Sequence, residues 1–213
     1  MITPDEKNLR QSHHPVFAAF FDWSARLGPA RRMTDPLRQE TAGQAIGLVL
    51  EVGAGSGLNF PFYMAERVER VEAIEPDGAM LTYARRRVVN APVPITLTQA
   101  SVEALPFSNE QFDSVVATLV FCSVNDPVRG FQEIKRVLKP GGILLLLEHV
   151  RADTSLTARI QDMVVPLTTR LSGNCHWNRD TGQLLGEAGF QVTHMRHLGG
   201  GLHPILLIHA TRP

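Results

Sequence analysis

The chain has 213 residues with 21 basic and 21 acidic side chains, so its formal net charge is zero. This length favours a single α/β domain with a sizeable core, and the balanced charge gives no sign of a nucleic-acid partner. No apolar run reaches the ~18 residues of a membrane span, and no signal-peptide pattern opens the chain, so we expect a cytoplasmic protein. We divide the chain into an N-terminal helical segment, residues 1–45, and a main domain, residues 46–213.

The segment His14–Leu27 has the spacing of an amphipathic helix. Its apolar side chains fall mainly on one helical face: Val16, Phe17, Phe20, Phe21 and Trp23. We predict that this helix is a lid over a site at the carboxyl ends of the strands, with Phe20 and Trp23 toward the substrate. Plain packing against the domain is the alternative. Membrane-surface attachment is less favoured, because the polar face is not rich in lysine.

A buried strand at Leu48–Gly53 leads directly into a glycine-rich turn, VLEVGAGSG. Glycines at alternate positions let the backbone turn sharply and let a ligand lie against the main chain. A dinucleotide fingerprint, G-x-G-x-x-G, would place its third glycine where Leu58 stands. The spacing therefore disfavours a pyrophosphate-binding loop and a nicotinamide-dependent dehydrogenase.

The next predicted strand, Val71–Glu75, ends in an acid. Glu75 follows the glycines at close to the ~20 residues at which a carboxylate binds ribose hydroxyls in this architecture. Pro76 then leads into a helix that carries Met80. The polarizable thioether of Met80 suits an adenine face, although core packing is the plainer interpretation.

Further strands alternate with helical patterns, as a doubly wound parallel sheet requires. Predicted strands cover 95–99, 112–118 and 142–150, and predicted helices cover 127–138, 154–171 (broken or kinked at Pro166) and 179–188. The closing segments, 190–198 and 204–211, flank three glycines and predict an antiparallel edge hairpin. The pattern predicts a Rossmann-like, mostly parallel seven-stranded sheet with helices on both faces.

The E-x-G-x-G-x-G turn and the segment ASVEALPF, residues 100–107, resemble the first motifs of class I S-adenosylmethionine-dependent methyltransferases. The resemblance implies the class I methyltransferase fold and S-adenosyl-L-methionine as cofactor, with S-adenosyl-L-homocysteine as product. The cofactor residues that we predict are Glu51, Gly53, Ala54, Gly55, Gly57, Asn59, Glu75, Pro76, Met80, Ser101, Val102, Glu103, Thr118 and Leu119. Ser101 stands where the family has an acid, so its hydrogen bond to adenine lacks a full charge.

Three segments resemble one branch, the alkyl-thiol S-methyltransferases and their bacterial relatives. They are TLVFCSV at 118–124, LEHV at 147–150 and GNCHWNRDT at 173–181. This resemblance implies S-methylation of a small thiol or sulfide. N-, O- or C-methylation of a small metabolite, phospholipid or quinone is the alternative, and a non-catalytic cofactor-binding module is the alternative from another class.

Methyl transfer to a thiol requires an in-line geometry and removal of one proton. His149, after the last parallel strand, and His176, in the loop before a helix, are the predicted catalytic residues; each could instead only hold a loop. We predict that Cys122, Cys175 and Trp177 line the acceptor pocket. The two cysteines have no metal-ligand spacing, so we expect free thiols and no metal.

Overall fold

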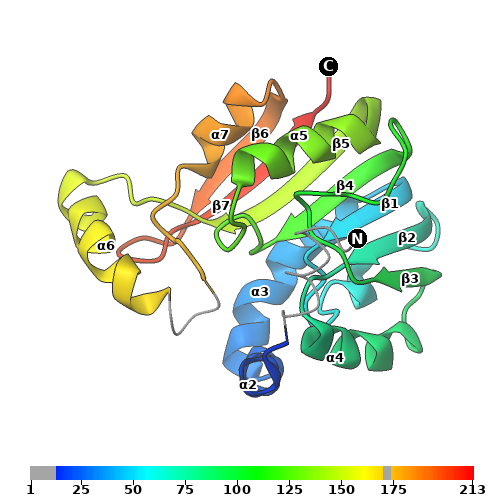
Figure 1. Cartoon of the computed structure of the whole chain (residues 1–213), viewed down its shortest axis with the longest axis horizontal. Coiled ribbons are helices and arrows are strands. Elements are labelled where there is room, and N and C mark those ends of the chain that lie inside the picture. The colour runs from blue at the N-terminus through cyan, green and yellow to red at the C-terminus, as the bar shows by residue number, and fades with distance from the viewer. Residues whose placement is uncertain (1–12, 170–173) are drawn as a thin grey trace, which may run out of the picture.

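The computed structural model describes residues 13–169 and 174–213, and Figure 1 shows their arrangement. One seven-stranded sheet runs in the order β3-β2-β1-β4-β5-β7-β6. Its strands are β1 Gly47–Val52, β2 Val68–Ile74, β3 Ile95–Thr98, β4 Phe112–Thr118, β5 Leu138–His149, β6 Gln191–Leu198 and β7 Ile205–Thr211. The helices are α2 Pro15–Ala25, α3 Gly28–Glu40, α4 Gly78–Val88, α5 Pro127–Val137, α6 Ser155–Thr168 and α7 Thr181–Glu187, with 3-10 turns η1 Ala42–Gln44 and η2 Phe60–Phe62.

The topology confirms the predicted fold class. Strands β1 to β5 pair in parallel, and β7 is antiparallel to both β5 and β6. Along β5, Leu144 and Leu146 are buried in the core cluster on one side of the sheet, whereas Leu145 is buried in the cluster on the other side. A strand that is apolar on both faces requires cover on both faces, and α4 and α5 lie on opposite sides of the sheet.

Several element boundaries differ from the prediction. β5 begins at Leu138 instead of Gly142, so the segment 139–142 belongs to the strand. α6 continues through Pro166, which lies in its last turn, so the predicted break is not seen there. The end of the predicted 154–171 helix lies outside the described residues. α3 lies within the predicted N-terminal helical segment, but a separate helix with these bounds was not predicted. Among the described residues, every helix is too short or too polar to cross a lipid bilayer.

The two N-terminal helices lie beside α4, near the carboxyl ends of β1 and β2 (Figure 1). Ala18 of α2 is buried in a small cluster with Ala79 and Met80 of α4, and Phe17 and Phe21 pack against that cluster. Asp22 of α2 is buried as well and forms an ion pair with Arg87 of α4, at 2.6 Å. The N-terminal segment therefore contacts the helix that follows the predicted ribose-binding acid.

Candidate functional site

The glycines of the turn after β1 have two different roles. Gly53, Gly55 and Gly57 all have positive φ, at 62°, 55° and 82°. A Cβ at Gly53 would lie 2.6 Å from Val120, and one at Gly57 would lie 2.5 Å from the Phe60 ring, so the protein itself fills those spaces. At Gly55 the nearest atom is a backbone oxygen at 4.0 Å. Gly55 therefore leaves open space where a ligand can approach the main chain.

Glu75 fastens this turn to the end of β2. One of its carboxylate oxygens accepts a hydrogen bond from the Gly55 amide and the other accepts one from the Asp77 amide, both at 2.9 Å. Burial raises the pKa of Glu75 to about 7, although these two amides favour the charged form. A carboxylate has about four acceptor positions, so two remain for ribose hydroxyls. The residues present fit the nucleoside part of the predicted cofactor.

Glu51 is held entirely by protein groups. Tyr63 donates its hydroxyl to Glu51 at 2.7 Å, and Asn59 donates its amide at 3.1 Å. The Asn59 amide also reaches the Thr118 hydroxyl at 3.1 Å, and its oxygen accepts a hydrogen bond from Arg38 of α3 at 2.6 Å. Burial raises the pKa of Glu51 to about 7. This network joins the ends of β1 and β4, and Arg38 is a member that the sequence did not reveal.

The predicted adenine-binding segment forms a closed local network. Ser101 donates its hydroxyl to Glu103 at 2.8 Å, and the other oxygen of Glu103 accepts a hydrogen bond from the Asp126 amide at 2.7 Å. Val102 is buried in the core beside β4. The serine that replaces the family's acid is thus already oriented by Glu103, and its contact with adenine remains a prediction.

Helix α2 shows one face to the domain and one to solvent. Its first turn is anchored where His14 Nδ1 lies 2.9 Å from an Asp77 carboxylate oxygen. Met80 is buried against α2, which is the core-packing interpretation of that residue. Phe20 and Trp23, the predicted substrate residues, are 63% and 55% exposed, with their rings 6.0 Å apart. The buried face of α2 thus lies against the cofactor side of the domain.

If α2 supports the cofactor site, weakening its contact with α4 should lower the affinity for the cofactor. We expect Phe17→Ala to lower the stability of the protein by roughly 1–2 kcal/mol, because it removes a partly buried ring from the α2–α4 contact. Affinity for S-adenosylhomocysteine should fall as well, because Asp77 and Met80 adjoin Glu75. Calorimetry and thermal unfolding measure both effects, and Val16→Ala, on the exposed face, is the matched control. Equal behaviour of the two variants would assign α2 no part in the site.

A second group of side chains gathers at the carboxyl ends of β4 and β5. Cys122 lies in the loop after β4, His149 ends β5, and Cys175 lies in the turn before α7. The Cys175 sulfur is 4.0 Å from His149 Nδ1, and the two sulfurs and one ring nitrogen all lie within 4.8 Å of one another. A hydrogen bond from Cys122, together with the nearby His149, lowers the pKa of Cys175 to about 5, and the same contact raises that of Cys122.

A buried carboxylate and a half-buried guanidinium hold the loop that carries Cys122. Glu148 accepts hydrogen bonds from the amides of Val120, Phe121 and Cys122, at 3.0, 2.9 and 3.3 Å. On the other side, Arg179 donates to the carbonyls of Phe121 and Val124, both at 2.6 Å. The LEHV acid and the NRDT arginine therefore fix this loop, a role that sequence reasoning had not assigned to Glu148.

The rings of His176, Trp177 and His203 lie near the cysteine and histidine side chains at the ends of β4 and β5. His176 donates its backbone amide to the Cys122 carbonyl at 2.6 Å, and its ring nitrogen lies 3.1 Å from the Asn174 side-chain oxygen. These contacts favour the loop-holding interpretation of His176. Trp177 is buried and stacks on His203, with ring centroids 4.0 Å apart. Sequence reasoning missed His203, because it follows three glycines that indicated only a hairpin turn.

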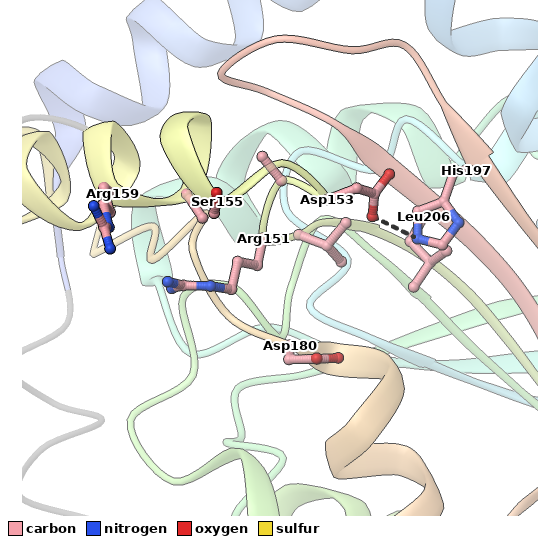
Figure 2. Close-up of a pocket in the computed structure, with 10 residues that line it drawn as sticks. Arg151, Asp153, Ser155, Arg159, Asp180, His197 and Leu206 are labelled. Carbon is pink, nitrogen blue, oxygen red and sulfur yellow. Dashed lines mark ion pairs between the residues drawn. The ribbon is translucent and has the colours of Figure 1, made fainter.

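A cavity of about 510 Å³ is lined by the residues that directly follow β5, by one residue each of β6 and β7, by the start of α6 and by the residue before α7 (Figure 2). Polar side chains dominate its wall, and His197 faces Asp153 across 3.9 Å. Arg151 is pulled to one side by a paired contact with Asp162, at 2.7 Å for both oxygens. Among the described residues that line this cavity, none was predicted as a site residue, although Val150 follows His149 directly.

The sequence of this chain is similar to those of known methyltransferases. Residues 50–146 match the family described as a methyltransferase domain. Human thiol S-methyltransferase TMT1A is 31% identical over 165 residues, which cover 75% of this chain and 67% of that protein. Rat TMT1B is 31% identical over 146 residues, which cover 67% of this chain but only 59% of that protein. Phosphatidylethanolamine N-methyltransferase of Cereibacter sphaeroides is 33% identical over 136 residues, covering 63% of this chain and 64% of that protein.

Solved structures agree on the fold. Haemonchus contortus phosphoethanolamine N-methyltransferase 2, in complex with S-adenosylhomocysteine, matches with a TM-score of 0.74 at 14% identity, over all of this chain and 61% of that one. A methyltransferase from Aquifex aeolicus matches with a TM-score of 0.63 at 19% identity, over 94% of this chain and 99% of that one. The chain belongs to the class I S-adenosylmethionine-dependent methyltransferases. Within that class it is related to the thiol S-methyltransferases TMT1.

Proposed function

We propose that the protein transfers the methyl group of S-adenosylmethionine to the sulfur of a small thiol or sulfide. One observation carries this proposal. Three segments resemble thiol S-methyltransferases, residues 118–124, 147–150 and 173–181, and their described residues meet at one point of the structure. Each contributes one side chain to the group there: Cys122, His149 and Cys175.

This point adjoins the proposed cofactor site. Thr118 ends β4 and is hydrogen-bonded to Asn59 of the glycine-rich turn, and the same loop reaches Cys122 only a few residues later. Bound cofactor supplies an electrophilic methyl group on a sulfonium. In-line displacement needs the acceptor sulfur roughly 3–3.5 Å from that carbon. An acceptor at the carboxyl ends of β4 and β5 approaches from the side opposite β2 and Glu75.

The contacts favour His149 over His176 as the residue that orients the sulfur of the methyl acceptor. His149 Nδ1 already faces a thiol, that of Cys175, at 4.0 Å. His176 is engaged with Asn174 and holds the Cys122 loop. We assign His149 to orient the acceptor sulfur, His176 to position the loop, and Trp177 with His203 to exclude water from one side.

A second candidate is N-methylation of a phospholipid headgroup. The similarity to the Cereibacter enzyme supports it, and so does the exposed apolar face of α2, which includes Val16, Phe20 and Trp23. That face is suited to contact with a lipid surface, although its polar side carries little positive charge.

A matched set of acceptors separates these functions. Hexanethiol, hexanol and hexylamine share one carbon skeleton, and phosphatidylethanolamine vesicles and a quinol complete the panel. We expect release of S-adenosylhomocysteine with the thiol to exceed that with the alcohol and amine by at least tenfold, because a thiol loses its proton far more readily than an alcohol does, and an alkylamine at neutral pH is protonated and has no free electron pair for the attack. Formation of the methyl thioether should match it mole for mole. Methylation of the amine, lipid or quinol without the thiol would reject the thiol assignment and leave the methyltransferase class intact.

A further inference from the structure

The cysteine–histidine group has the composition of a soft-metal site. Among the described residues, Cys122, His149 and Cys175 alone bring three such ligand atoms together, with all pairs within 4.8 Å. Both cysteines are free thiols. They lie far apart along the chain, so sequence spacing had predicted no metal site, yet the ends of β4 and β5 and the turn before α7 bring them together.

We propose that Cys122, His149 and Cys175 bind one zinc-like cation whose fourth position takes the sulfur of the acceptor. This deepens the proposed function and rests on it for the identity of the fourth ligand. Two thiolates and one imidazole are ligands that zinc prefers, and three protein ligands with one open position is the composition of catalytic zinc sites.

The distances agree with such a site. Zinc binds sulfur at about 2.3 Å and nitrogen at about 2.0 Å, so tetrahedral ligand atoms lie about 3.5–3.8 Å apart. The Cys175 sulfur and His149 Nδ1 are 4.0 Å apart, and the widest separation in the group is at most 4.8 Å. A contraction of about 1 Å or less would close the site around an ion.

The surroundings hold two of the ligands in place before any ion binds. The Cys122 amide is tied to Glu148, and the Cys122 carbonyl accepts from the His176 amide. His149 is the next residue after Glu148 on β5, so one buried strand end fixes both ligands. Cys122 is almost fully buried, whereas His149 and Cys175 are partly exposed. An ion here would therefore have its accessible side toward His149 and Cys175.

The chemistry balances without a further reactant. On binding, the acceptor thiol gives its proton to water and its sulfur forms a bond to the cation as a thiolate. The methyl–sulfonium bond of the cofactor then breaks as the bond from acceptor sulfur to methyl carbon forms. The products are neutral S-adenosylhomocysteine and a thioether, which binds zinc weakly and leaves. No oxidant or reductant takes part.

Metal binding is tested directly with tag-free protein that has been reduced and treated with a chelator. Titration with Co²⁺ should show about one ion per chain, with a sulfur-to-cobalt charge-transfer band and the visible bands of a tetrahedral site, and Zn²⁺ should abolish both. Cys175→Ser, at a partly exposed position, should weaken Co²⁺ binding at least about tenfold and reduce the charge-transfer band. His194→Ala, on the exposed side of β6, is the matched control and should change neither.

The outcomes divide cleanly. A reduced chain that shows no thiolate band, or one whose band is unchanged in Cys175→Ser, overturns the metal site; so does a chain whose two cysteines only form a disulfide. Hexanethiol should shift the visible bands of the Co²⁺ form, and an unchanged spectrum overturns the open fourth position. Full thiol methylation by metal-free protein overturns this inference but leaves the proposed function standing. A chain that binds the metal but methylates only amines would overturn the proposed function and leave the metal site standing.

Discussion

Glu75→Gln is expected to weaken binding of S-adenosylhomocysteine about 10- to 100-fold, because we propose that Glu75 forms a charge-assisted hydrogen-bond pair with the ribose, and such a pair contributes on the order of 1.5–3 kcal/mol. The amide retains one acceptor oxygen but presents NH₂ to whichever group faced the other oxygen. Calorimetry measures the affinity, and the thermal unfolding of the unliganded variant shows whether the amides of Gly55 and Asp77 still hold the turn. An affinity equal to that of the wild type would remove Glu75 from the cofactor site.

The same substitution tests whether Glu75 causes a pH dependence of S-adenosylhomocysteine binding. Burial raises the pKa of Glu75 from 4.5 to about 7 in the folded, unliganded protein. We propose that ribose hydroxyls donate to the ionised carboxylate, so the affinity for S-adenosylhomocysteine should rise between about pH 6 and pH 8 in the wild type and stay nearly constant in Glu75→Gln.

The unliganded protein should respond to pH in the opposite direction. A carboxyl whose folded pKa is raised stabilises the fold fully only below its unfolded pKa, and this contribution is lost as pH rises through about 7. The wild type should therefore lose more stability between pH 5 and pH 8 than Glu75→Gln does. Glu51 and Glu148 are shifted in the same direction, so the difference between the two proteins is the quantity to compare. Parallel stability curves would contradict the prediction.

Gly55→Ala should mainly lower cofactor affinity, whereas Gly57→Ala should mainly lower the stability of the fold. At Gly55 the new Cβ meets no protein atom closer than 4.0 Å, so the fold should lose only about 1–2 kcal/mol from the positive φ, while cofactor affinity should fall at least tenfold. At Gly57 the Cβ would lie 2.5 Å from the Phe60 ring, and the fold itself should lose several kcal/mol. Thermal unfolding and calorimetry with S-adenosylhomocysteine distinguish the two. Unimpaired cofactor binding by Gly55→Ala would show that the ligand does not approach the turn there.

The strands were predictable because burial leaves a direct pattern in the sequence. The apolar run of β5 favoured a strand covered on both faces, and the three glycines at 199–201 indicated the β6–β7 hairpin. The bounds of helix α3 were not predicted because its residues, GPARRMTDPLRQE, include two prolines and few apolar side chains. Arg38 of α3 is buried and hydrogen-bonded to Asn59, a partner that is not visible from local sequence.

The candidate site was predictable where one short segment carries it. The glycine-rich turn and Glu75 follow from local spacing, because the turn and the strand end are each continuous in sequence. The group around His149 is different, since its members come from three strand and helix ends that only the sheet order brings together. His203 shows the same limit: its stacking on Trp177 depends on how the β6–β7 hairpin returns, which no local pattern indicates.

The contact between Arg38 and Asn59 bears on how far the N-terminal segment can be exchanged between relatives. Arg38 comes from α3, yet it supplies the positive charge nearest to Glu51 beneath the glycine-rich turn. A chimaera that borrowed its first 45 residues from a relative without an arginine here would leave a buried carboxylate without its cation. Altering acceptor choice by grafting a new N-terminal segment therefore requires that Arg38 be carried along with it.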